Sequence, residues 1–65
     1  MKPIKKYSYE DWYEKYKGRI EHSCGVHFAD GWIGSFVRRK VSIIKNEIDM
    51  LIKEHGDVEY IATNK

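Results

Sequence analysis

Apolar residues between positions 8 and 17 recur with the period of an α-helix. They stand at i, i+3, i+4 and i+7 and therefore form one face: Tyr9, Trp12, Tyr13 and Tyr16. Ser8 is a favourable N-cap, and Gly18 is a favourable residue just past a helix end. The pattern predicts a helix over residues 8–17, with Trp12 and Tyr16 packed in the core.

After Gly18 the apolar period changes to two, which is typical of a strand with one buried face. The residues that share this parity are Ile20, His22, Cys24, Val26 and Phe28. The dipeptide Asp30-Gly31 favours a two-residue hairpin turn, because both of its positions tolerate a positive φ. We therefore expect a hairpin over residues 19–34, in which Phe28 faces Ile33 across the two strands.

The longest predicted element is a helix over residues 36–55. The residues of one helical face step alternately by four and three: Val37, Val41, Ile44, Ile48, Leu51 and His55. Ser35 is expected to cap its start and Gly56 its end. Residues 57–62 are rich in β-forming types and predict a closing strand, and residues 63–65 predict a frayed tail.

Together these elements predict one α+β domain over residues 1–65, in the order helix, β-hairpin, long helix, short strand. The helices are expected to pack on one face of a small antiparallel sheet. Residues 1–7 form either a basic N-terminal arm or a short strand. If Ile4 to Tyr7 are a strand, the order becomes βαββαβ, which is a compressed split-βαβ sandwich.

Length and composition restrict the function. A chain of 65 residues with a net charge of +2 has room for one small core, which excludes two domains and argues against an enzyme with a walled pocket. A single cysteine excludes a disulfide within the chain and, without an export signal, favours the reducing cytoplasm. No apolar run approaches the length of a membrane span. We expect no cofactor and no membrane partner.

His22, Cys24 and His27 are the residues most suggestive of chemistry. Thiolate and imidazole are good zinc ligands, but a structural zinc site needs four ligands in a tetrahedral array. The strand pattern also places His27 on the face opposite the other two residues. A thiolate activated by imidazole is a known nucleophile, yet no third orienting group can be named. We therefore expect neither a metal site nor catalysis.

A basic segment stands at the predicted start of the long helix. It consists of Arg38, Arg39 and Lys40, and Lys45 follows one to two turns later. Cations beside aromatic residues can bind phosphates and stack on bases. Nucleic-acid binding through these residues is therefore the alternative function.

A second apolar stripe on the predicted helix carries the leading hypothesis. Phe36, Ile43 and Met50 lie at i, i+7 and i+14, outside the core face, and Lys40 and Glu47 border them. Aromatic residues and Met are typical of interface cores. The expected function is a small non-enzymatic module that docks this surface on a protein partner or on a second copy. Frequent Ile, Lys and Tyr suggest an AT-rich coding sequence, which suits a regulator or inhibitor from a phage or other mobile element.

Overall fold

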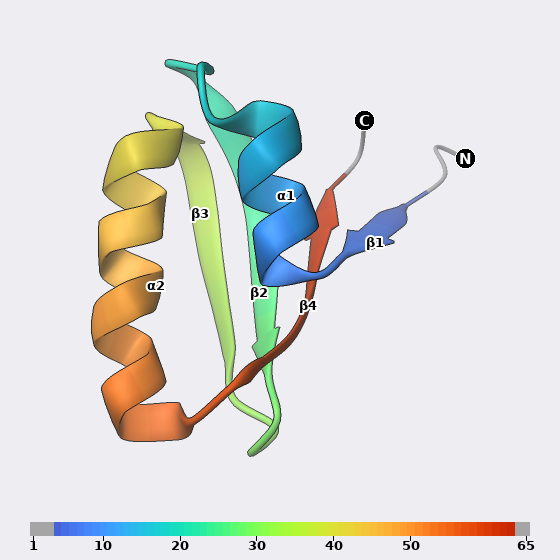
Figure 1. Ribbon diagram of the computed structural model, residues 1–65, viewed down its shortest axis with the longest axis vertical. Coiled ribbons are helices and arrows are strands. Elements are labelled where there is room, and N and C mark those ends of the chain that lie inside the picture. The colour runs from blue at the N-terminus through green and yellow to red at the C-terminus, as the bar shows by residue number, and fades with distance from the viewer. Residues whose placement is uncertain (1–3, 64–65) are drawn as a thin grey trace.

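The computed structural model describes residues 4–63 and contains six elements in the order βαββαβ. They are β1 (Lys5–Tyr7), α1 (Tyr9–Tyr16), β2 (His22–Phe28), β3 (Ile33–Arg39), α2 (Val41–His55) and β4 (Val58–Thr63) (Figure 1). The predicted α+β class is confirmed, and a strand precedes the first helix. Thr63, predicted to begin the frayed tail, is instead the buried last residue of β4. Residues 1–3 of the predicted arm and residues 64–65 of the predicted tail lie outside the described residues.

The four strands form one antiparallel sheet in the order β1-β4-β2-β3. β1 and β2 both run antiparallel to β4, which lies between them, so they are parallel to each other. β3 and β4 both run antiparallel to β2, which lies between them, so they are parallel to each other as well. Each helix therefore connects two parallel strands that enclose a third strand, and this is a split βαβ unit. Both helices pack on the same face of the sheet, as predicted (Figure 1).

The core lies between that face and the two helices. Its buried hydrophobic side chains are Trp12, Tyr16, Cys24, Val26, Phe28, Val41, Ile44, Ile48 and Ile61. Alternate residues of β2 point inward, as the period of two predicted. The core positions of Trp12 and Tyr16 are confirmed, with exposed fractions of 0% and 2%. Within residues 4–63, neither helix is long and apolar enough to cross a bilayer.

The predicted pairing of Phe28 with Ile33 is wrong by one residue. The turn is one residue longer than an Asp-Gly turn: Gly31 has a φ of 95°, and the Phe28 N–H donates to the Trp32 carbonyl at 2.9 Å. A three-residue loop that ends in a left-handed residue is the next most common hairpin connection. Ile33 consequently pairs with His27.

The shifted register exchanges the two faces of β3. Because successive side chains of a strand alternate, a slip of one residue moves each of them to the other side of the sheet. Ile33 and Val37 therefore lie on the open face, with exposed fractions of 55% and 66%. Gly34 and Phe36 face the helices instead. The predicted helix over residues 36–55 required Val37 to be a core residue. This part of the prediction is wrong.

The long helix begins at Val41 rather than at residue 36. Residues 36–39 continue β3, because β2 extends over seven residues and its backbone groups need a partner strand. The N-cap is Lys40, which makes no side-chain capping hydrogen bond, so the predicted cap at Ser35 is wrong. Sheet pairing overrides the helical periodicity here.

Candidate interaction surfaces

The face of the sheet opposite the helices is left open by residues 4–63 (Figure 1). Tyr60, His27 and Ile33 form one row across three neighbouring strands. The rings of His27 and Tyr60 stack with their centroids 4.2 Å apart, and the Lys6 ammonium lies 4.7 Å from the Tyr60 centroid. Lys6 and His27 come from the strands on either side of Tyr60. This ring is therefore already covered and is a poor platform for stacking bases.

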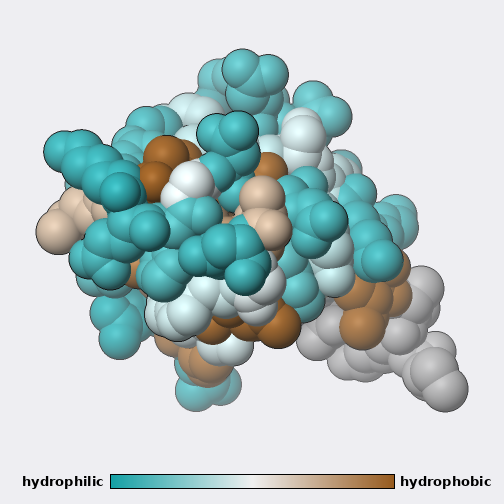
Figure 2. Space-filling model, turned by 90° about the horizontal axis from the view of Figure 1, so that it is seen from below, coloured by the Kyte–Doolittle hydropathy of each residue, from teal (hydrophilic) through white to brown (hydrophobic). Residues whose placement is uncertain are grey.

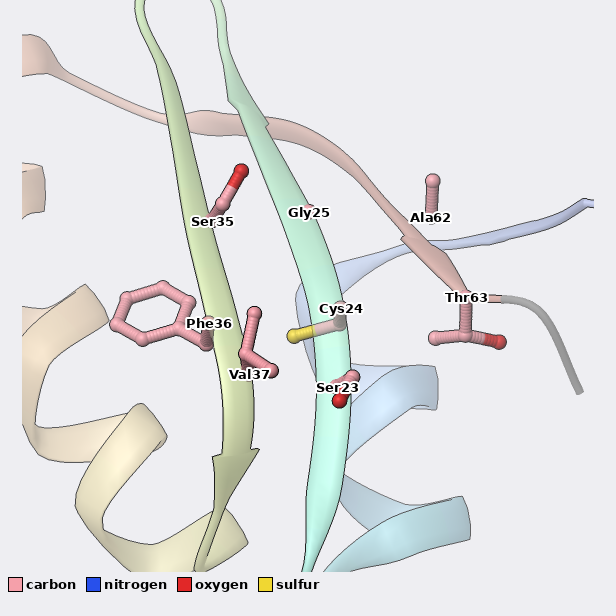
Figure 3. A pocket seen from close by; sticks show the side chains of 8 residues that line it. All are labelled: Ser23, Cys24, Gly25, Ser35, Phe36, Val37, Ala62 and Thr63. Carbon is pink, nitrogen blue, oxygen red and sulfur yellow. The ribbon is translucent and has the colours of Figure 1, made fainter.

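A hollow of about 250 Å³ lies beside this row, where Gly25 pairs with Ser35 on one side and Ala62 on the other (Figure 3). No atom lies within 4 Å of the place that a Cβ would take at Gly25. The lining consists of Ser23, Cys24, Gly25, Ser35, Phe36, Val37, Ala62 and Thr63. These eight residues offer hydroxyl groups and one thiol. They include no imidazole, carboxylate or amine that could transfer a proton.

One edge of the sheet is β3. The hydrogen bond from the Phe28 N–H to the Trp32 carbonyl fixes which backbone groups of β3 face β2. In an antiparallel ladder these groups alternate along the strand, so those of Ile33, Ser35 and Val37 point away from β2. All three residues are exposed. The edge of β3 therefore presents backbone hydrogen-bonding groups together with two aliphatic side chains.

The opposite edge, β1, is built differently. It is three residues long and contains Lys5 and Lys6, and short lysine-containing edges resist pairing between molecules. β3 has seven residues, and its irregularity is confined to one end, where a bulge sets Val37 and Arg38 opposite Ser23. There Arg38 adopts a φ of 54° and donates its N–H to the Ser23 hydroxyl at 3.0 Å. Before this bulge, β3 is a regular and partly apolar edge.

One end of the molecule gathers cations from two segments. The Val41 N–H donates to the Arg19 carbonyl at 3.1 Å, so the α1–β2 loop lies against the start of α2 (Figure 1). The backbone of Arg19 thereby lies close to the segment of Arg38, Arg39 and Lys40, while its guanidinium lies 5.4 Å from the Tyr16 centroid. None of these four residues forms an ion pair within residues 4–63. The first turn of α2 contains no acidic residue, so its helix dipole adds positive potential. We call these four residues the basic end.

The set of residues predicted for nucleic-acid binding is only partly brought together. Lys45 lies apart from the basic end: it bonds Asp49 at 2.9 Å and sits 5.5 Å from the Tyr13 centroid, beside α1. The Tyr9 hydroxyl also donates to Asp49, and these two donors lower the pKa of that carboxyl. Sequence patterns missed Arg19, because only the tertiary contact between the α1–β2 loop and the start of α2 brings it near Arg38, Arg39 and Lys40.

The other end of the molecule is acidic. The hairpin turn and the α2–β4 loop meet there, since the Ala29 N–H donates to the Asp57 carbonyl and Asp30 bonds His55 Nδ1, both at 2.9 Å. The carboxylates of Asp30, Glu54 and Asp57 are exposed at this end. Figure 2 shows it from below, covered mostly by hydrophilic residues. Lys53, in the last turn of α2, offsets one of these three negative charges, so this end has a net negative charge, opposite in sign to that of the basic end.

The predicted stripe of Phe36, Ile43 and Met50 is not one surface. Phe36 belongs to β3 and points toward α2 (Figure 3). Ile43 and Met50 lie on the outward side of α2, with exposed fractions of 43% and 69%. The bordering residues Lys40 and Glu47 are exposed as well. Whether this side of α2 contacts a partner stays a prediction.

His22 and Cys24 are buried in β2, whereas His27 lies on the opposite face, as the strand pattern predicted. The Trp12 indole N–H donates to His22 Nε2 at 3.1 Å, and the His22 ring packs on Tyr16 with a centroid distance of 4.4 Å. Burial raises the pKa of the Cys24 thiol to about 12, so at neutral pH it is protonated rather than a thiolate. Within residues 4–63, no three His, Cys, Asp or Glu side chains are grouped to hold a metal ion.

We predict that the protein becomes less stable as the pH falls through the range of histidine titration. Burial, and to a smaller extent the charge of Arg19, lower the pKa of His22 below 6.5. The unfolded chain therefore binds this proton first. The contribution of His22 to stability is complete well above pH 6.5 and declines below it, until the pH reaches the lower pKa of the folded state. Protonation also removes the Nε2 lone pair that accepts the Trp12 bond.

Urea unfolding between about pH 5 and pH 8 measures this effect. His22→Gln is expected to flatten the dependence of the unfolding free energy on pH, and the control His27→Gln is expected to retain it. Equal slopes in the wild type and in His22→Gln would contradict the role of this group.

Comparison with known protein families, curated protein sequences and solved structures finds no match for this chain.

Proposed function

We propose that this chain is a small protein-binding module without catalytic activity of its own, and that it docks through the edge of β3. The proposal rests on one observation. The backbone N–H and C=O groups of Ile33, Ser35 and Val37 point away from β2, and all three residues are exposed. Addition of a strand to an exposed edge is a recurrent mode of recognition, in which backbone hydrogen bonds supply affinity and side chains supply specificity. Trp32, which is 41% exposed next to this edge, adds an aromatic residue of the kind that interfaces favour.

A second candidate function is nucleic-acid binding at the basic end. The contact between Arg19 and Val41 favours it, because this contact brings the backbone of a fourth cationic residue close to the segment of Arg38, Arg39 and Lys40. The net charge of only +2 and the acidic opposite end weigh against it. Binding to phosphates would weaken steeply with salt, whereas docking on β3 would depend on salt far less. The exposed edge therefore carries the leading proposal.

The proposal is tested by affinity capture from a lysate of the source cell. We expect the wild type and Ile43→Asp to retain the same protein, and Ser35→Pro to lose it, because proline removes an edge N–H without disturbing the bonds to β2. A partner that Ser35→Pro still retains would contradict docking on β3. Release of the captured material by nuclease, together with its loss in Arg19→Glu, would favour the second candidate.

A further inference from the structure

We infer that the partner of the β3 edge is a second copy of this chain, paired antiparallel about a two-fold axis at Ser35. The inference rests on the proposed docking role of β3. Ser35 is the middle one of the three residues whose backbone groups point outward. A pair centred on it sets Ser35 opposite Ser35 of the second copy, and Ile33 opposite Val37 of the second copy. The same surface patch is then used by both copies, as a two-fold dimer requires.

The backbone of β3 is compatible with this register. Each of the three opposed pairs can exchange two hydrogen bonds, which makes about six across the interface. Opposed residues of an antiparallel ladder share a face, so Ile33 and Val37 form an aliphatic cross-strand pair on the open face. Moving the axis by one residue leaves two regular pairs, because the strand ends at the Gly31 turn and at the Arg38 bulge. The axis at Ser35 therefore makes the fullest use of the edge.

The helix-side residues of β3 are complementary in the same register. Gly34 lies opposite Phe36 of the second copy, so in this register the Phe36 ring meets the Trp32 ring beside Gly34. The Trp32 ring already covers Gly34 within the chain: its Cζ3 atom lies 2.9 Å from the place of a Cβ. Phe36 is half-buried and Trp32 is 41% exposed, so pairing brings two incompletely buried aromatic side chains together. Aromatic residues at the centre are typical of protein interfaces.

The charges of the two ends favour the antiparallel direction. The acidic hairpin end of one copy, with Asp30, then lies beside the basic end of the other, with Arg39 and Lys40. A parallel partner would place like charges together at both ends. Complementary charge fixes orientation and register at interfaces. The polarity of the molecule thus selects the same arrangement as the register of the backbone.

Sedimentation velocity between about 10 µM and 1 mM tests the inference, a range that suits the weak association expected of a small interface. The wild type should shift from monomer to dimer over this range. Ser35→Pro should raise the dissociation constant about 10- to 100-fold, because it removes one N–H from each copy. The matched control Ser35→Ala keeps both N–H groups and should dimerise normally. If circular dichroism shows that Ser35→Pro is unfolded, Val37→Lys replaces it, since this change alters only an exposed side chain.

Cross-linking tests the position of the axis. With a short bismaleimide, Ser35→Cys should give a covalent dimer, because the axis places the two thiols next to each other. Ser42→Cys, on the exposed side of α2, should give little. A wild type that stays monomeric up to 1 mM, or equal cross-linking at both positions, overturns the second copy as the partner. The docking function of β3 would then still be decided by the capture experiment, in which a monomer can retain a different protein.

Discussion

Trp12→Ala is expected to unfold the protein or to leave it only marginally stable. Trp12 is fully buried, packs against Tyr9 and donates its indole N–H to His22 at 3.1 Å. Truncation of a buried tryptophan costs about 3–5 kcal/mol. The free energy of unfolding of a domain of this size is about 3–10 kcal/mol, so the loss removes most or all of it. Circular dichroism and urea unfolding at neutral pH measure the effect.

Trp32→Ala is the matched control. Trp32 is 41% exposed and stacks on His55 with a centroid distance of 4.4 Å, so its removal should cost about 1 kcal/mol and leave a cooperative transition. The expected order of stability is wild type, then Trp32→Ala, then Trp12→Ala. A folded Trp12→Ala variant with nearly wild-type stability would show that Trp12 is not central to the core.

Ile44→Asp is expected to abolish folding, whereas Ile43→Asp leaves it intact. The two residues are neighbours on α2 and have the same side chain, but Ile44 is fully buried and Ile43 is 43% exposed. A carboxylate at position 44 would be buried without a partner, which costs more than the whole stability of a small domain. At position 43 the carboxylate stays in contact with water, so the free energy of unfolding should change by only about 0.5 kcal/mol.

Thermal melts and circular dichroism of the two variants measure this contrast. Unfolding of Ile43→Asp would mean that the outward side of α2 is covered in the folded protein. It would also remove Ile43→Asp as the folded comparison in the capture experiment. A cooperative melt of Ile44→Asp would contradict the packing of α2 on the sheet.

Local sequence patterns correctly predicted those features that depend only on residues close together in the chain. The apolar spacing of α1, with Ser8 as its cap, defined that helix to within one residue at each end. The period of two along β2 correctly placed His22 and Cys24 inside and His27 outside. These features depend on backbone geometry within a few residues, so the amino-acid pattern contains them.

The start of the long helix could not be read from the same pattern. Val37 stands four residues before Val41, and this spacing suits a helix, yet Val37 is equally suited to a strand by its branched side chain. Residues 36–39 form a strand because the backbone N–H and C=O groups of β2 need hydrogen-bond partners. These groups lie more than ten residues away in the chain, so a local sequence window does not include them.

The candidate surfaces were decided almost entirely by tertiary structure. One additional residue in the hairpin turn moved Ile33 and Val37 to the open face and created the exposed edge. The hydrogen bond from the Val41 N–H to the Arg19 carbonyl brought the α1–β2 loop to the start of α2, and the carboxylates of Asp30 and Asp57 lie at the opposite end. The sequence by itself determined the class of fold, the inward face of β2 and the aromatic core of α1, because these follow from local periodicity. The register, the helix start and the interaction surfaces required the long-range pairing of strands, because a shift of one residue costs little locally but exchanges every side chain between the two faces.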